Sequence, residues 1–382
     1  MLRDELIRRI HDSAHRGVIV VTGGGSLLLS DLLQVPGASA TVLEARVPYH
    51  ANALAEFLGA TPEQAASAST ACDLAMAAYV RARTLANATK GGTDDRDLFG
   101  LAVTASLATT RAKRGAHRVH VAAQTGAMTR SLSLVLAKGT RTRAGEESVC
   151  RDLALDALAR AIGIAGGVAP DLTANERIDE ERMDARDGWQ ALIAGEIGAL
   201  PHPEIAPFPR ALLPGAFNPL HDGHRAMAAD ASRRLQAPVA FELCVRNVDK
   251  PPLHYLAIAH RLAQFEPDTP VWLTALPTFV EKARHFPHVR FVVGVDTVVR
   301  IADPRYYGGD PVARDQAITE LRELGAGFLV YGRRVNRHFT VLEDLDLPAA
   351  LQALCEGVSE RDFRNDASST ALRKAGLPSS AG

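Results

Sequence analysis

Short aliphatic runs alternate with longer Ala-rich or amphipathic segments in the first part of the chain. The β-branched run Val18–Val21 ends in Thr22-Gly23-Gly24-Gly25, which predicts a buried strand, a tight turn and a following helix. Further predicted elements are helices over residues 62–85 and 146–162 and strands over residues 98–105 and 118–123. Because strands and helices alternate, we expect residues 1–165 to form an α/β layered domain.

Residues 166–208 have a different composition. They begin with Gly166-Gly167, contain the charge-rich stretch NERIDEERMDARDG and end in PHPEIAPFP, which predicts a linker with one short helix around Trp189–Ile197. From Ala211 the strand and helix alternation resumes and predicts a parallel sheet with crossover helices over residues 209–382. The expected elements are strands near 211–213, 239–245, 272–274, 291–294 and 328–331, and helices from about His224 and after Ser369.

Length and charge narrow the function classes. A chain of 382 residues favours two domains, each with its own core. With 43 Lys and Arg against 44 Asp and Glu, the chain has no overall basic field to bind nucleic acid or an anionic membrane. The four cysteines have neither disulfide-framework nor zinc spacing, and the N-terminus lacks the apolar core of a secretory signal. We therefore expect a cytoplasmic protein with no nucleic-acid or membrane partner.

The most informative stretch, PGAFNPLHDGH (Pro214–His224), joins a predicted strand to a predicted helix. Backbone N–H groups and the helix dipole favour an anion at such a junction, and Gly223 would let that anion approach the backbone. His221 and His224 could donate ring N–H groups to phosphate oxygens. The two histidines could instead bind a metal or be incidental surface residues, but no third ligand stands at a matching interval, so we predict no protein metal site.

This stretch resembles the G-x-F-x-P-x-H-x-G-H signature of the nucleotidyltransferase superfamily with the H-x-G-H motif. That superfamily includes nicotinamide and nicotinate mononucleotide adenylyltransferases, phosphopantetheine adenylyltransferases and cytidylyltransferases. Residues Ser368–Arg373, SSTALR, resemble its S-S-T-x-[IL]-R motif. Hydroxyl groups at a helix start with an arginine one turn on would make a second phosphate clamp, although such a pattern alone is also a plain N-cap. The resemblance covers about residues 209–378 and implies a Rossmann-like parallel sheet.

Three landmarks between these motifs also resemble the family, although each alone is typical of an ordinary loop. Lys250 stands where relatives have a phosphate-binding lysine, Gly294-Val295-Asp296 resembles G-x-D, and Gly332-Arg333 resembles the G-R segment. The resemblance assigns catalytic roles to His221, His224, Lys250 and Arg373. It assigns nucleotide binding to Gly215, Ala216, Phe217, Asn218, Gly223, Gly294, Asp296, Arg333, Ser368, Ser369 and Thr370.

The reaction implied by this resemblance is nucleotidyl transfer from ATP or CTP to a phosphorylated small molecule, with release of pyrophosphate. Positioning and charge stabilisation would supply the catalysis, and Mg²⁺ would be held mainly by phosphates and water. A pyridine mononucleotide is the leading acceptor, because both halves of the chain resemble families that handle it. The alternatives are a cytidylyltransferase with another substrate and a non-catalytic nucleotide sensor.

The stretch from Val20 to Ala60 resembles the start of the competence-damage-inducible (CinA-like) C-terminal domain, the nicotinamide mononucleotide deamidase family. Thr22-Gly23-Gly24, Gly37-Ala38-Ser39 and Tyr49 fall in the places of its pattern. Val20 stands where that family has its serine nucleophile and Leu54 where it has a lysine, and aliphatic side chains cannot replace them. We therefore expect a CinA-like domain without deamidase activity that binds a ligand, regulates or forms a homo-oligomer.

Overall fold

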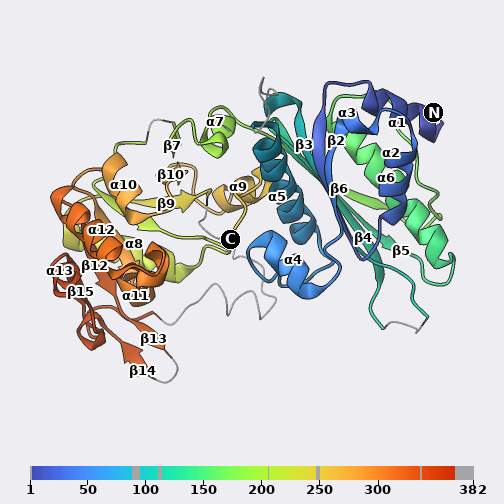
Figure 1. The fold of residues 1–382 in the computed structure, drawn as a ribbon. Coiled ribbons are helices and arrows are strands. Elements are labelled where there is room, and N and C mark those ends of the chain that lie inside the picture. Colours follow the sequence, from blue (N-terminus) through green and yellow to red (C-terminus); the bar gives the residue numbers. More distant parts are fainter. Residues whose placement is uncertain are drawn as a thin grey trace. The chain divides into compact units, whose positions relative to one another are not determined.

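The computed structural model divides into two compact units (Figure 1). It describes residues 2–87, 95–110, 114–204, 206–246, 250–335 and 338–365. The first unit comprises Met1–Gln190 and Asn247–Ala259, and the second comprises Ala191–Arg246 and His260–Gly382. Residues 247–259 thus belong to the first unit although they interrupt the sequence of the second.

The first unit is built on a mixed six-stranded sheet. The strands lie in the order β2 (Val42–Arg46), β1 (Arg16–Thr22), β3 (Leu98–Ser106), β4 (His117–Thr125), β5 (Met128–Leu136), β6 (Ile178–Asp184). The first three pair in parallel, and every later pair is antiparallel. Since β-branched side chains suit a pleated, buried surface, the run Val18–Val21 forms the buried centre of β1.

Helices cover both faces of this sheet. The helices of the unit are α1 (Arg3–His11), α2 (Ser26–Gln34), α3 (Ala38–Thr41), α4 (Ala51–Leu58), α5 (Ala68–Asn87) and α6 (Arg143–Ala161), with the 3-10 helix η1 (Asp95–Asp97). Apolar residues of α1, α2 and α6 pack on one face, and those of α4 and α5 pack on the other. The α/β layered architecture expected for this half is therefore confirmed.

The stretch expected to be a linker contains regular structure. Its charged segment forms β6, an edge strand whose side chains are mostly exposed, and it is followed by α7 (Trp189–Ala194) and β7 (Ala199–His202). Hydrophobic periodicity does not reveal β6, because few of its side chains are buried. The charges on this edge strand also discourage its pairing with other chains.

The second unit contains a seven-stranded sheet. The strands lie in the order β15 (Cys355–Val358), β12 (Gly327–Tyr331), β11 (Arg290–Gly294), β8 (Ala211–Pro214), β9 (Val239–Cys244), β10 (Val271–Thr274), β7. All neighbours are parallel except β10 and β7. The five strands expected in this half are confirmed. Numbered in chain order from β8, the parallel strands lie in the order 3-2-1-4-5-6, so the winding reverses between β8 and β11.

Helix α9 (Tyr255–Leu262) lies mostly in the segment that belongs to the first unit. The remaining elements of the second unit are α8 (Asp222–Leu235), α10 (Phe279–His285), α11 (Val295–Ala302), η2 (Pro304–Tyr307), α12 (Pro311–Glu323), β13 (Arg333–Val335), β14 (His338–Thr340), η3 (Leu342–Asp344) and α13 (Ala349–Gln352). Helices α10 to α13 share one apolar core with the sheet. Helix α8 is linked to β12 by the Tyr331 hydroxyl, which donates to Asp230 at 2.8 Å. The helix expected after Ser369 lies outside the described residues.

Candidate functional site

Three of the predicted motifs meet at the carboxyl edge of the second unit's sheet. The turn with His221 and His224 follows β8, Gly294 and Asp296 stand at the end of β11, and Gly332-Arg333 follows β12. Because β8, β11 and β12 are parallel and adjacent, their carboxyl ends lie at one edge. In open α/β sheets this edge, at the point where the strand order reverses, is where ligands bind.

The two histidines form one rigid turn. Their rings stack with centroids 3.8 Å apart and an angle of 24° between the planes. The His221 backbone N–H donates to His224 Nδ1 at 3.3 Å, and the His224 N–H donates to the His221 carbonyl oxygen at 2.9 Å. Helix α8 therefore begins at Asp222, with His221 as its N-cap, two residues before the predicted start at His224.

An aromatic cluster supports this turn from below. Phe217 is buried in a left-handed backbone conformation with φ of 45°, and its ring meets the edges or faces of His224, Phe241 and Phe265 at centroid distances of 5.2–5.5 Å. A Cβ at Gly215 would lie 2.5 Å from the Phe217 ring, so glycine is needed there. The Phe217 side chain thus packs in the core of the turn, whereas Ala216 and Asn218 are exposed.

Gly223 lies close to two side chains of the same unit. A Cβ at this position would lie 2.8 Å from Asn365 Oδ1 and 2.9 Å from the His221 ring. Protein side chains, rather than a ligand, therefore occupy the space that the glycine leaves open. Asn365 is a site residue that the sequence analysis missed, because a single asparagine outside any motif carries no recognisable signal.

Burial keeps the histidine pair neutral. It lowers the pKa of His224 to about 4, with the neighbouring His221 as a smaller cause. Burial also lowers the pKa of His221, against the opposing effect of the Asp222 carboxylate. Because His224 Nδ1 accepts a backbone hydrogen bond, its neutral ring carries the proton on Nε2. His221 Nδ1 is buried and has no hydrogen-bond partner in the described part of the chain. The pair can donate hydrogen bonds to phosphate without carrying positive charge.

A cation and an anion face each other at the neighbouring strand ends. Arg333 Nη1 donates to Asp296 Oδ2, and both side chains are about half exposed. Gly294 is the N-cap of α11, and Asp296 lies in the first turn of that helix. The carboxylate expected to meet the nucleotide is therefore already paired with a predicted nucleotide-binding arginine.

Lys250 is exposed and belongs to a segment of the first unit. In this segment the Tyr255 N–H donates to Thr129 Oγ1 at 3.0 Å and the Tyr255 hydroxyl donates to the Gly126 carbonyl at 2.6 Å. Ser368, Ser369, Thr370 and Arg373 lie outside the described residues.

The glycine turn of the first unit is occupied by the protein's own carboxylate. Glu147 Oε2 accepts from the N–H groups of Gly25 at 2.8 Å and Ser26 at 3.1 Å, at the start of α2. Arg143 donates to the Gly23 carbonyl at 2.9 Å and pairs with Glu147 at 3.2 Å. An internal anion thus stands where a phosphate would bind a helix start, so the turn is structural.

The two aliphatic replacements in the CinA-like pattern are core residues. Val20 is 0% exposed and Leu54 is 3% exposed, and both pack in the apolar cluster beneath α5. Tyr49, in contrast, is 67% exposed. Val20 and Leu54 therefore serve packing in the first unit.

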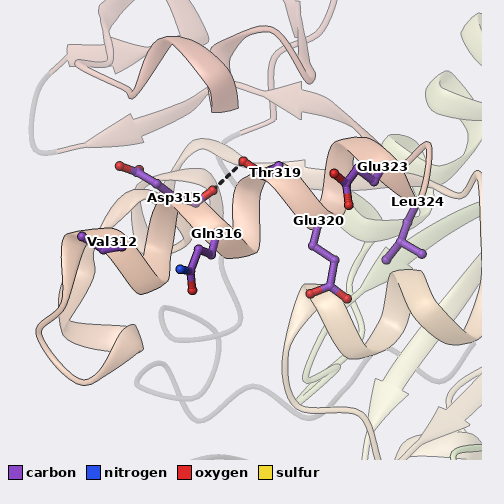
Figure 2. Close-up of a pocket in the computed structure, with 7 residues that line it drawn as sticks. All are labelled: Val312, Asp315, Gln316, Thr319, Glu320, Glu323 and Leu324. Carbon is purple, nitrogen blue, oxygen red and sulfur yellow. Dashed lines mark hydrogen bonds between the residues drawn. The ribbon is translucent and has the colours of Figure 1, made fainter.

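A separate hollow lies along α12 (Figure 2). It has a volume of about 670 Å³, and Figure 2 shows its lining side chains on successive turns of the helix. Its lining includes the carboxylates of Asp315, Glu320 and Glu323, of which Asp315 pairs with Arg314 and Glu320 pairs with Arg284. The Thr319 hydroxyl donates to the Asp315 carbonyl at 2.9 Å. None of the predicted site residues lines this hollow.

The described ranges of the chain contain no group of three or more His, Cys, Asp or Glu side chains placed to hold a metal ion. They also contain no helix with the length and apolar character needed to cross a membrane.

No protein-family model and no curated protein matches the chain. Three solved structures are similar to parts of it. Competence/damage inducible protein CihA from Agrobacterium tumefaciens is 23% identical over 43% of this chain and 95% of its own, with a TM-score of 0.32. CinA superfamily proteins from Escherichia coli and Enterobacter cloacae are 15% and 18% identical, over 41% and 42% of this chain and 87% of each of theirs, with TM-scores of 0.33 and 0.30. At these TM-scores the likenesses carry no inference about the site.

Replacing Glu147 by alanine should loosen the start of α2, because two backbone N–H groups lose their acceptor. We expect the local opening free energy to fall by about 1–2 kcal/mol, which is about a 5- to 30-fold faster hydrogen exchange for residues 25–34. Ser148→Ala is the control, since the Ser148 hydroxyl donates only to the Ala144 carbonyl of its own helix. Equal exchange in the two variants would contradict the capping role of Glu147.

The depressed pKa of His224 should make the second unit less stable in acid. The pKa is about 4 in the folded state and about 6.5 when unfolded, so the stabilisation is complete above pH 6.5 and is lost as the pH falls toward 4. We expect a loss of about 1–3 kcal/mol across this window. Urea unfolding followed by Trp272 fluorescence in a Trp189→Phe background measures it. His224→Gln should flatten the pH dependence, and an unchanged slope would refute the assignment.

Proposed function

We propose that the second unit is a nucleotidyltransferase domain that transfers a nucleoside monophosphate from ATP to a phosphorylated small molecule and releases pyrophosphate. The observation that carries this proposal is the meeting of the H-x-G-H turn, the G-x-D segment and the G-R segment at adjacent parallel strand ends. The H-x-G-H turn and the G-x-D segment are 70 residues apart in the sequence, from His224 to Gly294, yet the sheet brings them to one edge. If the three short motifs resembled the family only by chance, there would be no reason for them to lie at the same edge of the sheet.

The strand order supports a Rossmann-like sheet. The order 3-2-1-4-5-6 is the order of doubly wound dinucleotide-binding sheets, and the H-x-G-H turn follows the first strand, next to the reversal. In such sheets the nucleotide phosphates lie at the helix that follows the first strand. Helix α8 holds that position here.

The roles of Lys250, Ser368, Ser369, Thr370 and Arg373 stay predictions of the resemblance. Residues 368–373 lie outside the described residues.

Positioning would provide most of the catalysis. His224 Nε2–H and the His221 ring would donate to phosphate oxygens, and the rigid stack would hold the α-phosphorus in line with the attacking acceptor oxygen. The attacking oxygen forms the new bond to phosphorus as the bond to the pyrophosphate oxygen breaks. No residue of the chain is assigned to hold Mg²⁺, which would come with the nucleotide and supply charge neutralisation for the leaving pyrophosphate.

The acceptor is proposed from the resemblance, and the role of the first unit from the chemistry of its side chains. We infer a pyridine mononucleotide as acceptor, because the motifs of both halves resemble families that handle this compound. The first unit would serve as a binding, regulatory or self-associating domain, since Val20 and Leu54 are packed in its core. A buried aliphatic side chain offers neither a nucleophile nor a base.

Calorimetric titration with MgATP tests the proposed site. We expect binding by the wild-type chain and a Kd about 10- to 100-fold higher for His224→Ala, because one phosphate donor is lost. His50→Ala, at an exposed cap in the first unit, is the control. Pyrophosphate release with nicotinamide mononucleotide should follow the same pattern. The assignment is wrong if the wild type and His224→Ala bind MgATP with the same affinity and also bind MgCTP with the same affinity.

The full-length protein should release no ammonia from nicotinamide mononucleotide. Thr22 or Ser26 could be offered as a substitute nucleophile, but Thr22 lies two residues further along β1 than Val20, roughly 6.6 Å away at about 3.3 Å per residue, and Ser26 is the first residue of α2. An ammonia assay on wild type, Thr22→Ala and Ser26→Ala decides this. Turnover that either substitution abolishes would show that the first unit is an active amidohydrolase.

A further inference from the structure

The loop between β8 and the histidine turn contains a strained residue that its surroundings must hold. Phe217 has a left-handed backbone with φ of 45°, which a residue with a side chain adopts only at a cost in free energy. Leu220 immediately precedes His221, so the backbone from Phe217 to Leu220 sets where the histidine turn begins. The contacts of this backbone therefore decide the shape of the proposed phosphate site.

Gln264, which belongs to none of the motifs, bonds to this loop through both ends of its carboxamide. Its Oε1 accepts from the Leu220 N–H at 2.8 Å, and its Nε2 donates to the Phe217 carbonyl oxygen at 3.1 Å. The opposite orientation of the amide would set donor against donor and acceptor against acceptor, so these two contacts fix its orientation. Leu220 is buried, and a buried N–H that loses its acceptor costs more free energy than one that can turn to water.

Gln264 is itself held by its neighbours in the second unit. Arg225, which follows His224 in α8, donates from Nη2 to the Gln264 carbonyl oxygen at 2.9 Å. Gln264 Nε2 also donates to the His260 carbonyl oxygen, in the last turn of α9, at 3.2 Å. The next residue, Phe265, packs edge-to-face on the Phe217 ring with centroids 5.3 Å apart. Residues 264 and 265 therefore connect the loop to the start of α8 and to the end of α9.

We propose that Gln264 is a positioning residue of the second unit's site, which holds the backbone from Phe217 to Leu220 in the shape that binds a nucleoside triphosphate. This inference rests on the proposed nucleotidyltransferase function. A loop that already has its bound shape loses less conformational freedom on binding, so Gln264 favours binding through the loop rather than through a ligand contact of its own. A single glutamine after a helix forms no recognisable pattern, so no motif includes it.

Two substitutions in the full-length protein separate hydrogen bonding from packing. Gln264→Met is uncharged and of similar length but removes both hydrogen bonds to the loop, whereas Gln264→Glu keeps an acceptor for the Leu220 N–H. Gln316→Met is the matched control, because Gln316 is an exposed residue of α12. Hydrogen exchange of the ligand-free proteins measures the protection of the Leu220 amide, and calorimetry measures the Kd for MgATP. Thermal unfolding reports any global loss of structure.

We expect the Leu220 amide to exchange about 5- to 30-fold faster in Gln264→Met than in the wild type, and the Kd for MgATP to rise about 3- to 30-fold. In Gln264→Glu the amide should stay closer to the wild-type rate, because its acceptor is kept. Gln316→Met should match the wild type in both measurements. If Gln264 only packed against the loop, methionine would protect the amide better than glutamate, and that order would refute the proposal.

Binding decides whether the hydrogen bonds matter for the site. If Gln264→Met exchanges faster but keeps the wild-type Kd for MgATP while His224→Ala weakens binding, Gln264 has no positioning role and the proposed function stands. Failure of the wild type to bind MgATP would overturn both proposals. If Gln264→Met loses its fold, Gln264→Asn replaces it, because its amide is one methylene too short to reach both partners and should change the exchange rate and the Kd in the same direction.

Discussion

Strand β8 pairs in parallel with β9 on one side and with β11 on the other, and this double pairing sets the position of every other part of the second unit's site. The chain must leave the carboxyl end of β8 at the place where the winding reverses. It does so through a short turn that is buried below by Phe217 and closed above by the histidine stack. The turn cannot be lengthened or repacked without moving the start of α8.

The helix starts of the two units show opposite solutions to one physical problem. A helix start leaves backbone N–H groups without partners, and something must accept from them. At α2 the acceptor is Glu147, a carboxylate of the same unit that brings its own negative charge. At α8 the His224 ring accepts from the His221 N–H without adding charge, and the Asp222 carboxylate supplies the negative charge of the first turn. A carboxylate thus accepts from the N–H groups at the start of α2, whereas a neutral ring accepts at the start of α8.

The sequence allows prediction of elements whose side chains are buried and of motifs that are contiguous. Val18–Val21 and the five strands of the second unit are short apolar runs, and burial on the sheet explains why their signal is clear. Strand β6 has no such signal because its side chains face solvent. A motif also does not predict that the segment of Lys250 belongs to the first unit, since this depends on the hydrogen bonds of Tyr255 with Thr129 and Gly126.

A sequence motif also cannot identify site residues that are brought together by contacts between distant parts of the chain. Gly223 is part of a recognisable pattern, but the pattern does not say that Asn365, 142 residues later, occupies the space beside it. Arg333 and Asp296 likewise belong to two different motifs, and the sequence suggests a role for each of them separately. It does not show that the two side chains form an ion pair. Motifs therefore locate the edge of the sheet at which chemistry is expected, and tertiary packing decides which charges remain available there.

Burial and charge set competing demands on this edge. An apolar floor of aromatic rings orients the histidines, and the same burial that orients them removes their charge by lowering the pKa of each ring. The guanidinium of Arg333, after the end of β12, reaches water and therefore keeps its charge, which the Asp296 carboxylate balances. Burial thus fixes and neutralises the imidazole rings of the turn, and the charged groups at the neighbouring strand ends are exposed.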